Sequence, residues 1–244
     1  TRPVAVLDFA SLYPSVMLAH NLCPSTFVPP DSPRMEGVTY ETHEVAPGKS
    51  YTFATNVKGI LPELLKDILA ARKRAKKQMG EATSASEKAI FNGRQLALKI
   101  SANSAYGFFG AEETGPFPFS ALCECVTFRG RAMIDLTARL SVEYFLPWEA
   151  KVVYGDTDSV FVDILEEGLT VAQVFEKGLL VGQKVTKHLV EPNDLEMEKV
   201  YLPLNLMGKK CYVGKLYEPN KAGEVVFKYV DAKGCELARR DNAP

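Results

Sequence analysis

Two acidic segments that lie far apart in the chain place the strongest constraint on how it folds. Asp8 directly follows the apolar run Val4 to Leu7 in VLDFASLYPS, and Asp156 and Asp158 lie in VVYGDTDSV. The apolar and alternating residues 151–164 predict a β-hairpin whose tip carries both of these acids. Carboxylates crowded in this way repel each other unless a cation lies between them. The two segments therefore predict a fold that gathers three carboxylates around divalent cations.

Each acidic segment also has a purely structural interpretation. Asp8 could be a helix N-cap or a turn residue, because a helical pattern opens soon after it at Pro14. Asp156 and Asp158 could be present only for their turn propensity. If the three carboxylates converge instead, their hard oxygen ligands suit two Mg²⁺ ions, with Mn²⁺ as a substitute. Two such ions about 4 Å apart activate a hydroxyl and stabilise a leaving pyrophosphate in phosphoryl transfer.

The composition sets wide limits on the class of protein. With 244 residues, of which 46% are hydrophobic, the chain is long enough for one large domain or two closely packed subdomains. A formal net charge of −1 neither supports nor excludes nucleic acid, which would have to bind local basic patches. No apolar run is long enough to span a membrane. The absence of a CxxC pair predicts free thiols in a reducing compartment; the cysteines are Cys23, Cys123, Cys125, Cys211 and Cys235.

A pair of antiparallel helices is predicted after residue 60. The first begins at Leu61, ends at Gly80 and has apolar residues at helical spacing, namely Leu61, Leu64, Leu65, Ile68 and Leu69. Ser84 and Glu87 have the spacing of a capping box, which predicts a second helix that passes through Ile90, Leu96 and Ile100 and stops at Gly107.

Both predicted helices carry residues suited to binding phosphates. Arg72 and Lys76 are four residues apart on the first helix, and Lys99, Asn103 and Tyr106 share one side of the second. Facing sets of this kind could bind phosphates and stack a base, although an ordinary solvated helix is the alternative for the first set.

The turn after Asp8 offers backbone N–H groups to a triphosphate. Residues 9–13 lead into the predicted helix, and a helix N-terminus binds anions. Tyr13 would lie under the sugar and exclude a 2′-hydroxyl, whereas an ordinary core tyrosine is the alternative.

The rest of the chain predicts an α+β fold. Residues 24–59 suggest an irregular insertion or a small hairpin. Helices are expected at 120–143 and 171–189, and strands at 195–202, 210–217 and 224–230.

Charged residues of the last strands have two interpretations. Lys209, Lys210 and Lys233, with Arg239 and Arg240, could contact duplex phosphates or remain solvated. Glu196 and Glu198 alternate with apolar residues, so they could join the metal site or form ion pairs with Lys199 or Lys210; we favour ion pairs.

Four ordered motifs, DFASLYPS, KISANSAYG, YGDTDS and GKKCY, resemble those of the family B DNA polymerases. The chain is similar to the palm and fingers of that family throughout, and most similar to its eukaryotic delta-type members and to those of large DNA viruses. The resemblance implies an antiparallel-sheet palm with an inserted antiparallel helical pair as the fingers. It divides the chain into a first palm part at 1–60, fingers at 61–107 and a second palm part at 108–244.

The resemblance implies a role for each candidate residue. The metal ligands would be the carboxylates of Asp8, Asp156 and Asp158 and the carbonyl of Phe9, and Lys99 is the candidate for protonating the pyrophosphate. The nucleotide would be bound by Ser11, Leu12, Tyr13, Arg72, Lys76, Lys99, Asn103 and Tyr106. Primer-template DNA would contact Lys209, Lys210, Tyr212, Lys233, Arg239 and Arg240. One departure is Cys211, where the family commonly has arginine.

The activity implied is template-directed addition of deoxynucleoside triphosphates to a primer 3′ end in DNA replication. No exonuclease or thumb is visible, so we expect the chain to be part of a longer protein, with a processivity factor or accessory subunits bound elsewhere. The location would be the nucleus for a cellular protein, and the host nucleus or cytoplasm for a viral one. A metal-dependent nuclease and a catalytically inactive binding module are the alternative classes.

Overall fold

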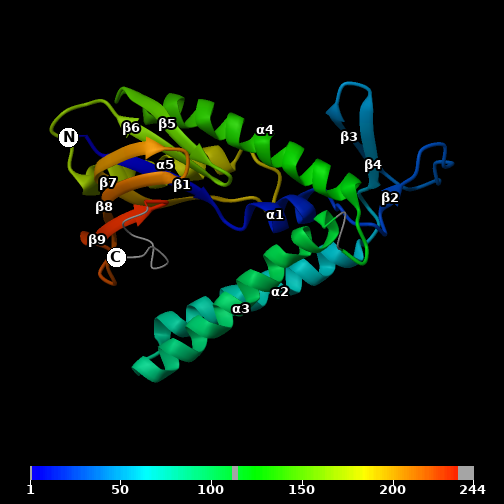
Figure 1. The fold of residues 1–244 in the computed structure, drawn as a ribbon, viewed down its shortest axis with the longest axis horizontal. Coiled ribbons are helices and arrows are strands. Elements are labelled where there is room, and N and C mark those ends of the chain that lie inside the picture. Colours follow the sequence, from blue (N-terminus) through cyan, green and yellow to red (C-terminus); the bar gives the residue numbers. More distant parts are fainter. Residues whose placement is uncertain (1, 112–114, 236–244) are drawn as a thin grey trace. The chain divides into compact units, whose positions relative to one another are not determined.

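The computed structural model describes residues 2–111 and 115–235. The chain divides into two compact units (Figure 1). The sheet unit comprises residues 1–10, 131–190 and 194–244, and the helical unit comprises residues 11–130 and 191–193. Within the described residues, no helix is both long enough and apolar enough to cross a membrane.

The sheet unit is built on a six-stranded antiparallel sheet in the order β5-β6-β1-β7-β8-β9. Its first four strands in that order are β5 (Ala150–Asp156), β6 (Ser159–Ile164), β1 (Val4–Phe9) and β7 (Leu195–Gly208). The last two are β8 (Cys211–Pro219) and β9 (Val225–Lys233). The short N-terminal strand therefore lies in the middle of the sheet, although its neighbours come from the second half of the chain.

Helix α5 (Val171–Thr186) covers one face of this sheet. A Cβ added at Gly178 would lie 2.4 Å from the Met197 sulfur, and one at Gly182 would lie 2.8 Å from the Leu195 carbonyl oxygen. Small residues thus let the helix approach β7 closely. Met197 lies opposite Leu7, which is fully buried, so this face is apolar core.

The other face of the sheet holds an aromatic cluster. Phe161, Tyr201 and Tyr212 are buried together with Val4 and Val6, and Tyr154 packs against them; the Phe161 and Tyr201 rings are stacked at 6.2 Å. Side chains alternate along a strand, so Asp8 belongs to the same face as Val4 and Val6. The acid therefore stands at the end of an otherwise apolar row.

The described residues of the helical unit form three helices, a small sheet and the first part of a fourth helix. Helix α1 (Leu12–Ala19) contacts both α2 (Ile60–Glu81) and α3 (Ala85–Gly110), which pack against each other. The small antiparallel sheet has the order β2-β4-β3, from β2 (Phe27–Val28), β4 (Lys49–Ala54) and β3 (Tyr40–Ala46). Helix α4 (Ser120–Phe145) begins in this unit and ends in the sheet unit.

The structure confirms the α+β class and most of the predicted elements. The Ser84 side chain accepts from the Glu87 amide and the Glu87 carboxylate accepts from the Ser84 amide, so the predicted capping box is formed. Of the apolar residues whose spacing predicted these helices, Leu61 and Leu65 are buried, whereas Leu64, Ile90 and Ile100 are exposed. Apolar periodicity thus predicted the helices, but it did not determine which of their apolar residues are buried.

Candidate active site

Cross-strand register aligns four residues across four strands of the sheet unit. Asp8 of β1 lies opposite Ser159 of β6 on one side and opposite Glu196 of β7 on the other. Ser159 lies opposite Asp156, the last residue of β5. Residues directly opposed in antiparallel strands project to the same face, with Cβ atoms about 5 Å apart. These four residues, which we call the carboxylate row, therefore bring three acids to one face of the sheet.

Asp158 stands beside the carboxylate row in the turn between β5 and β6. Thr157 in this turn has a φ of 55°, in the left-handed region that tight hairpins use. The Asp158 amide donates to the Asp156 carbonyl at 2.5 Å, and the Asp158 carbonyl accepts from the Phe9 amide at 2.8 Å. The second bond ties the hairpin turn to the end of β1. The structure thus brings Asp8, Asp156 and Asp158 together.

Lys210 binds the outer end of the carboxylate row. Its Nζ lies 2.5 Å from Asp156 Oδ1, and its backbone amide donates to the Tyr154 hydroxyl at 2.8 Å. The hydrogen bond and charge of Asp156 raise the pKa of Lys210, so this ammonium stays protonated. Carboxylate oxygens are the ligands that a hard divalent ion such as Mg²⁺ prefers. The residue types of the carboxylate row therefore suit a divalent metal.

A β-bulge separates the roles of Glu196 and Glu198. Leu7 pairs with Met197 and the preceding Val6 pairs with Lys199, so Glu198 has no partner on β1. Lys199 lies 3.1 Å from the Glu198 carboxylate. Burial alone would lower the pKa of Lys199, but the charge and hydrogen bond of Glu198, together with Tyr212 and Asp231, outweigh burial and raise it. The ion-pair interpretation holds for Glu198, whereas register brings Glu196 next to Asp8.

In the helical unit, five predicted nucleotide-binding residues meet at the start of α1. Ser11 is the N-cap, with φ 57° and ψ 56°, and its Oγ accepts from Arg72 Nη1 at 2.8 Å. The Tyr13 and Tyr106 ring centroids are 4.6 Å apart. Leu12 has a buried side chain, and its backbone N–H lies in the first turn, where helices leave such donors unused. Residues from α1, α2 and α3 thus converge on one helix N-terminus.

The remaining predicted nucleotide-binding residues are exposed on the two long helices. Lys76 follows Arg72 by one helical turn on α2. Asn103 and Lys99 precede Tyr106 by one and two turns on α3, and both side chains are exposed. These three residues therefore lie on the same sides of α2 and α3 as Arg72 and Tyr106, which contact residues of α1 or its N-cap.

The predicted DNA-binding residues have different surroundings. Lys209 and Lys210 form the exposed turn between β7 and β8, and the Lys233 ammonium lies 3.3 Å from Asp231. Tyr212 is only 7% exposed and packs in the aromatic cluster, so most of its ring is buried, and its contact with DNA stays a prediction. Arg239 and Arg240 lie outside the described residues.

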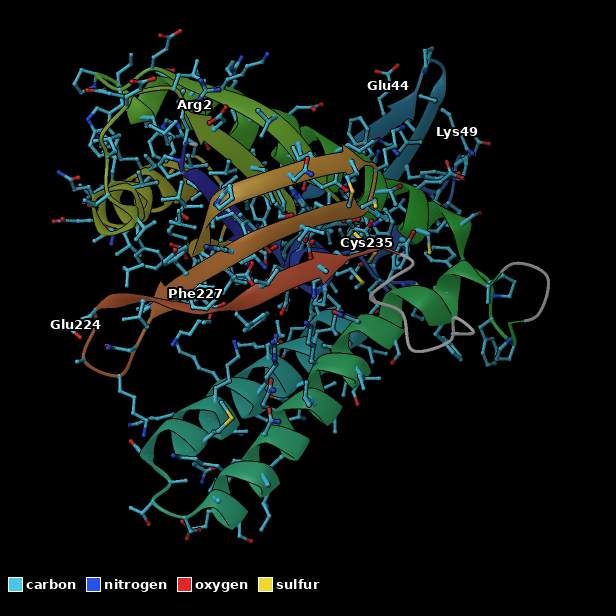
Figure 2. The ribbon with its side chains drawn as sticks, turned by 60° about the vertical axis from the view of Figure 1, so that its left-hand side comes forward. Arg2, Glu44, Lys49, Glu224, Phe227 and Cys235 are labelled. Carbon is cyan, nitrogen blue, oxygen red and sulfur yellow. The ribbon has the colours of Figure 1, made fainter. Side chains whose placement is uncertain are left out.

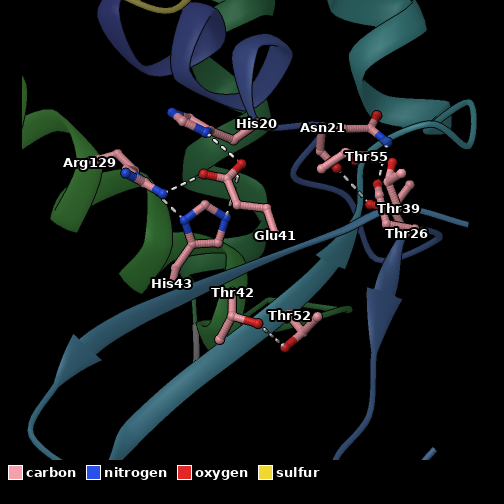
Figure 3. A network of polar contacts seen from close by, with 11 residues as sticks. His20, Asn21, Thr26, Thr39, Glu41, Thr42, His43, Thr52, Thr55 and Arg129 are labelled. Carbon is pink, nitrogen blue, oxygen red and sulfur yellow. Dashed lines mark hydrogen bonds and ion pairs between the residues drawn. The ribbon is translucent and has the colours of Figure 1, made fainter. Parts of the chain in front are cut away.

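A polar network in the helical unit was not anticipated from the sequence. Arg129 of α4 donates from Nη2 to Glu41 Oε1 and from Nε to His43 Nδ1, and His20 Nδ1 lies 2.9 Å from Glu41 Oε2 (Figure 3). The ligand atoms of His20, Glu41 and His43 lie within 4.8 Å of one another, a spacing that would suit a metal. However, arginine can only donate, so His43 carries its proton on Nε2 and cannot offer that atom to a metal. The network is better explained as a structural contact between β3, α1 and α4.

A family model and several relatives of known function are similar to this chain over nearly its whole length. The family model for "DNA polymerase family B" matches residues 1–244. The chain is 48% identical over 255 residues to the DNA polymerase delta catalytic subunit of Caenorhabditis elegans, covering 100% of the chain and 22% of that protein. It is 43% identical to the same subunit of Arabidopsis thaliana, covering 99% of the chain and 22% of that protein. The Candida albicans subunit is also 43% identical, with 98% and 23% covered. The chain thus spans about a fifth of the length of these relatives.

Proposed function

The chain belongs to family B of the DNA polymerases, and from this premise we propose that it carries the nucleotidyl-transfer centre of a template-directed DNA polymerase. The observation that carries the proposal is the carboxylate row, with Asp8 in register between the β5–β6 hairpin and Glu196. A strand from the N-terminus and a hairpin from the second half of the chain are needed to assemble it. Such an arrangement is expected of a site for metal-dependent phosphoryl transfer.

Asp8, Asp158 and the Phe9 carbonyl are the proposed metal ligands, with Asp156 as an auxiliary carboxylate. Two bound Mg²⁺ ions would supply charge to activate the primer 3′-hydroxyl and to stabilise the pyrophosphate; Mn²⁺ is a substitute. The Lys210 ammonium lies 2.5 Å from Asp156 Oδ1, so metal binding at Asp156 would compete with this ion pair. The released lysine would then be able to contact a DNA phosphate.

The start of α1 is the proposed site for the triphosphate. The backbone N–H groups of Ser11 and Leu12 would donate to phosphate oxygens, and the positive end of the helix dipole favours the negative charge. Arg72 is held beside Ser11 by its 2.8 Å hydrogen bond, which orients the guanidinium for bidentate phosphate binding. Lys76, Lys99 and Asn103 would extend this phosphate site along the helices.

Tyr13 is the proposed steric gate against ribonucleotides. Its ring is held by contact with Tyr106 at 4.6 Å, which limits the freedom of both rings. A ring fixed in this way would collide with a 2′-hydroxyl on the sugar, while Tyr106 would lie near the nascent base pair.

Residues 1–60 and 108–244 are the proposed palm and residues 61–107 the proposed fingers. Primer-template DNA would contact Lys209, Lys210 and Lys233 through phosphates, without reading sequence. Accessory subunits would bind elsewhere in a longer protein. We expect a nuclear location in a cell, or the host nucleus or cytoplasm for a viral enzyme.

Primer extension tests the proposal directly. Asp158→Asn should abolish extension of a primed template with Mg²⁺ and dNTPs, because the neutral amide is a much weaker ligand for Mg²⁺. Asp163→Asn is the matched control, since this aspartate lies at the other end of β6 and pairs with Arg2 at 2.9 Å. Equal extension by wild-type protein and Asp158→Asn would refute the metal assignment. Degradation of the primer without synthesis would indicate a nuclease instead.

A further inference from the structure

Two cysteines at one end of the sheet unit have their sulfur atoms in contact. Cys211 opens β8, and Cys235 follows the end of β9 by two residues (Figure 2). Their Sγ atoms are 3.7 Å apart, and both side chains are partly exposed. The other three cysteines, Cys23, Cys123 and Cys125, are buried.

The backbone explains why these two sulfurs meet. Tyr212 pairs with Lys233 at the end of the β8–β9 ladder, so Cys211 and the residues after Lys233 lie at the same end. Gly234 has a φ of 63°, and a Cβ at this position would lie 1.9 Å from the Lys210 carbonyl oxygen. Only glycine permits this approach, and it brings Cys235 against Cys211.

We propose that Cys211 and Cys235 are a site of oxidative modification, at which hydrogen peroxide produces a reversible intramolecular disulfide. The sulfurs need to approach by about 1.7 Å to reach a disulfide bond length. One thiol reacts with peroxide to give a sulfenic acid and water. The second thiol then attacks the sulfenic sulfur, the S–S bond forms and a second water leaves. The two thiols lose two electrons and two protons, and the peroxide is reduced to water.

The surroundings distinguish these two thiols from the buried cysteines. Desolvation and the Cys211 sulfur raise the pKa of Cys235, which lowers the fraction of its reactive thiolate. Both sulfurs are partly exposed, so peroxide can reach either one. By contrast, burial raises the pKa of Cys125 to about 12, which keeps this thiol protonated and inert.

The bond would act on a turn that touches the carboxylate row. Cys211 directly follows Lys210, whose amide donates to Tyr154 and whose ammonium binds Asp156. A disulfide at Cys211 would also restrain the C-terminal end of this turn, in addition to the contacts that Lys210 makes.

Differential alkylation with mass spectrometry tests the proposal. The protein is treated with hydrogen peroxide, its remaining thiols are blocked with iodoacetamide, and it is digested without reductant. We expect a linked pair of peptides that contain Cys211 and Cys235, lighter than their sum by two hydrogen atoms and separated by dithiothreitol. The linked pair should be absent in Cys211→Ser and Cys235→Ser and should persist in Cys123→Ser. Recovery of both cysteines as separate alkylated or sulfinic peptides, or linkage only between molecules, would overturn the proposal.

Hydrogen exchange provides a second measurement. Amides of residues 209–212 should exchange at least about threefold more slowly in the oxidised protein than in the reduced protein, because the disulfide restrains local opening. Cys235→Ser should show no such change on treatment with peroxide. Equal exchange in oxidised and reduced protein would overturn the predicted restraint of the turn.

Discussion

Acidification is expected to destabilise the helical unit through His43. This ring is fully buried, and its Nδ1 accepts from Arg129 Nε at 2.9 Å. Protonation of Nδ1 would set two donors against each other and put a positive ring beside the guanidinium. Burial and the Arg129 charge lower the pKa of His43 to about 4. The folded protein therefore resists protonation at this ring.

The size of the effect follows from proton linkage. An unfolded histidine has a pKa of about 6.5, so between this value and about 4 the unfolded chain binds more protons than the folded one. Stability must then fall as the pH falls through this window, by about 2 kcal/mol between pH 7 and pH 5 for this one ring. Burial also lowers the pKa of His20, which adds to the loss in the same direction.

Urea unfolding followed by far-UV circular dichroism at pH 7, 6 and 5 would measure this dependence. His43→Gln removes the titrating ring. Between pH 7 and pH 5, the free energy of unfolding of this variant should therefore decrease by about 2 kcal/mol less than that of the wild-type protein. His188→Gln is the matched control, because this exposed histidine lies in the sheet unit, bonded to Tyr144. Identical pH slopes for wild-type protein and His43→Gln would refute the reasoning.

Four further outcomes are expected. Lys99→Ala should lower the single-turnover rate of nucleotide incorporation far more than nucleotide affinity, and an unchanged rate would remove its proposed role as proton donor. Tyr13→Ala should increase ribonucleotide incorporation relative to deoxynucleotide incorporation in matched kinetic assays; an unchanged ratio would argue against a steric gate. Lys210→Ala should reduce the slope of log affinity for primer-template against log salt by about one, whereas an unaltered slope would exclude a phosphate contact. Ser84→Ala should lower the unfolding free energy by about 1 kcal/mol through loss of the helix cap, which thermal unfolding would detect.

The elements that could be predicted from the sequence have signals within a few neighbouring residues. The capping box of Ser84 and Glu87 depends only on spacing, and the hairpin at Asp156 depends on local alternation and turn propensity. The candidate residues near α1 were also identified in advance. Their contacts, such as that between Ser11 and Arg72, join segments separated by 61 residues and came only from the fold.

Tertiary structure alone decided two features of the sheet unit. A one-residue bulge in β7 aligned Glu196 with Asp8 and left Glu198 to Lys199, which regular alternation does not reveal. The burial of Tyr212 in an aromatic cluster could not be predicted, because a tyrosine at a strand position is equally suited to a core and to a surface.

The Arg129 network and the Cys211–Cys235 contact also required the fold, since their members come from separate elements. The sequence by itself thus determined which helices and strands form and which residue types can bind metal and phosphate. The pairing of distant strands, their register and the packing of α4 on β3 decided which of those residues meet. Local propensity acts over a few residues, whereas register and packing depend on contacts between segments that the sequence separates.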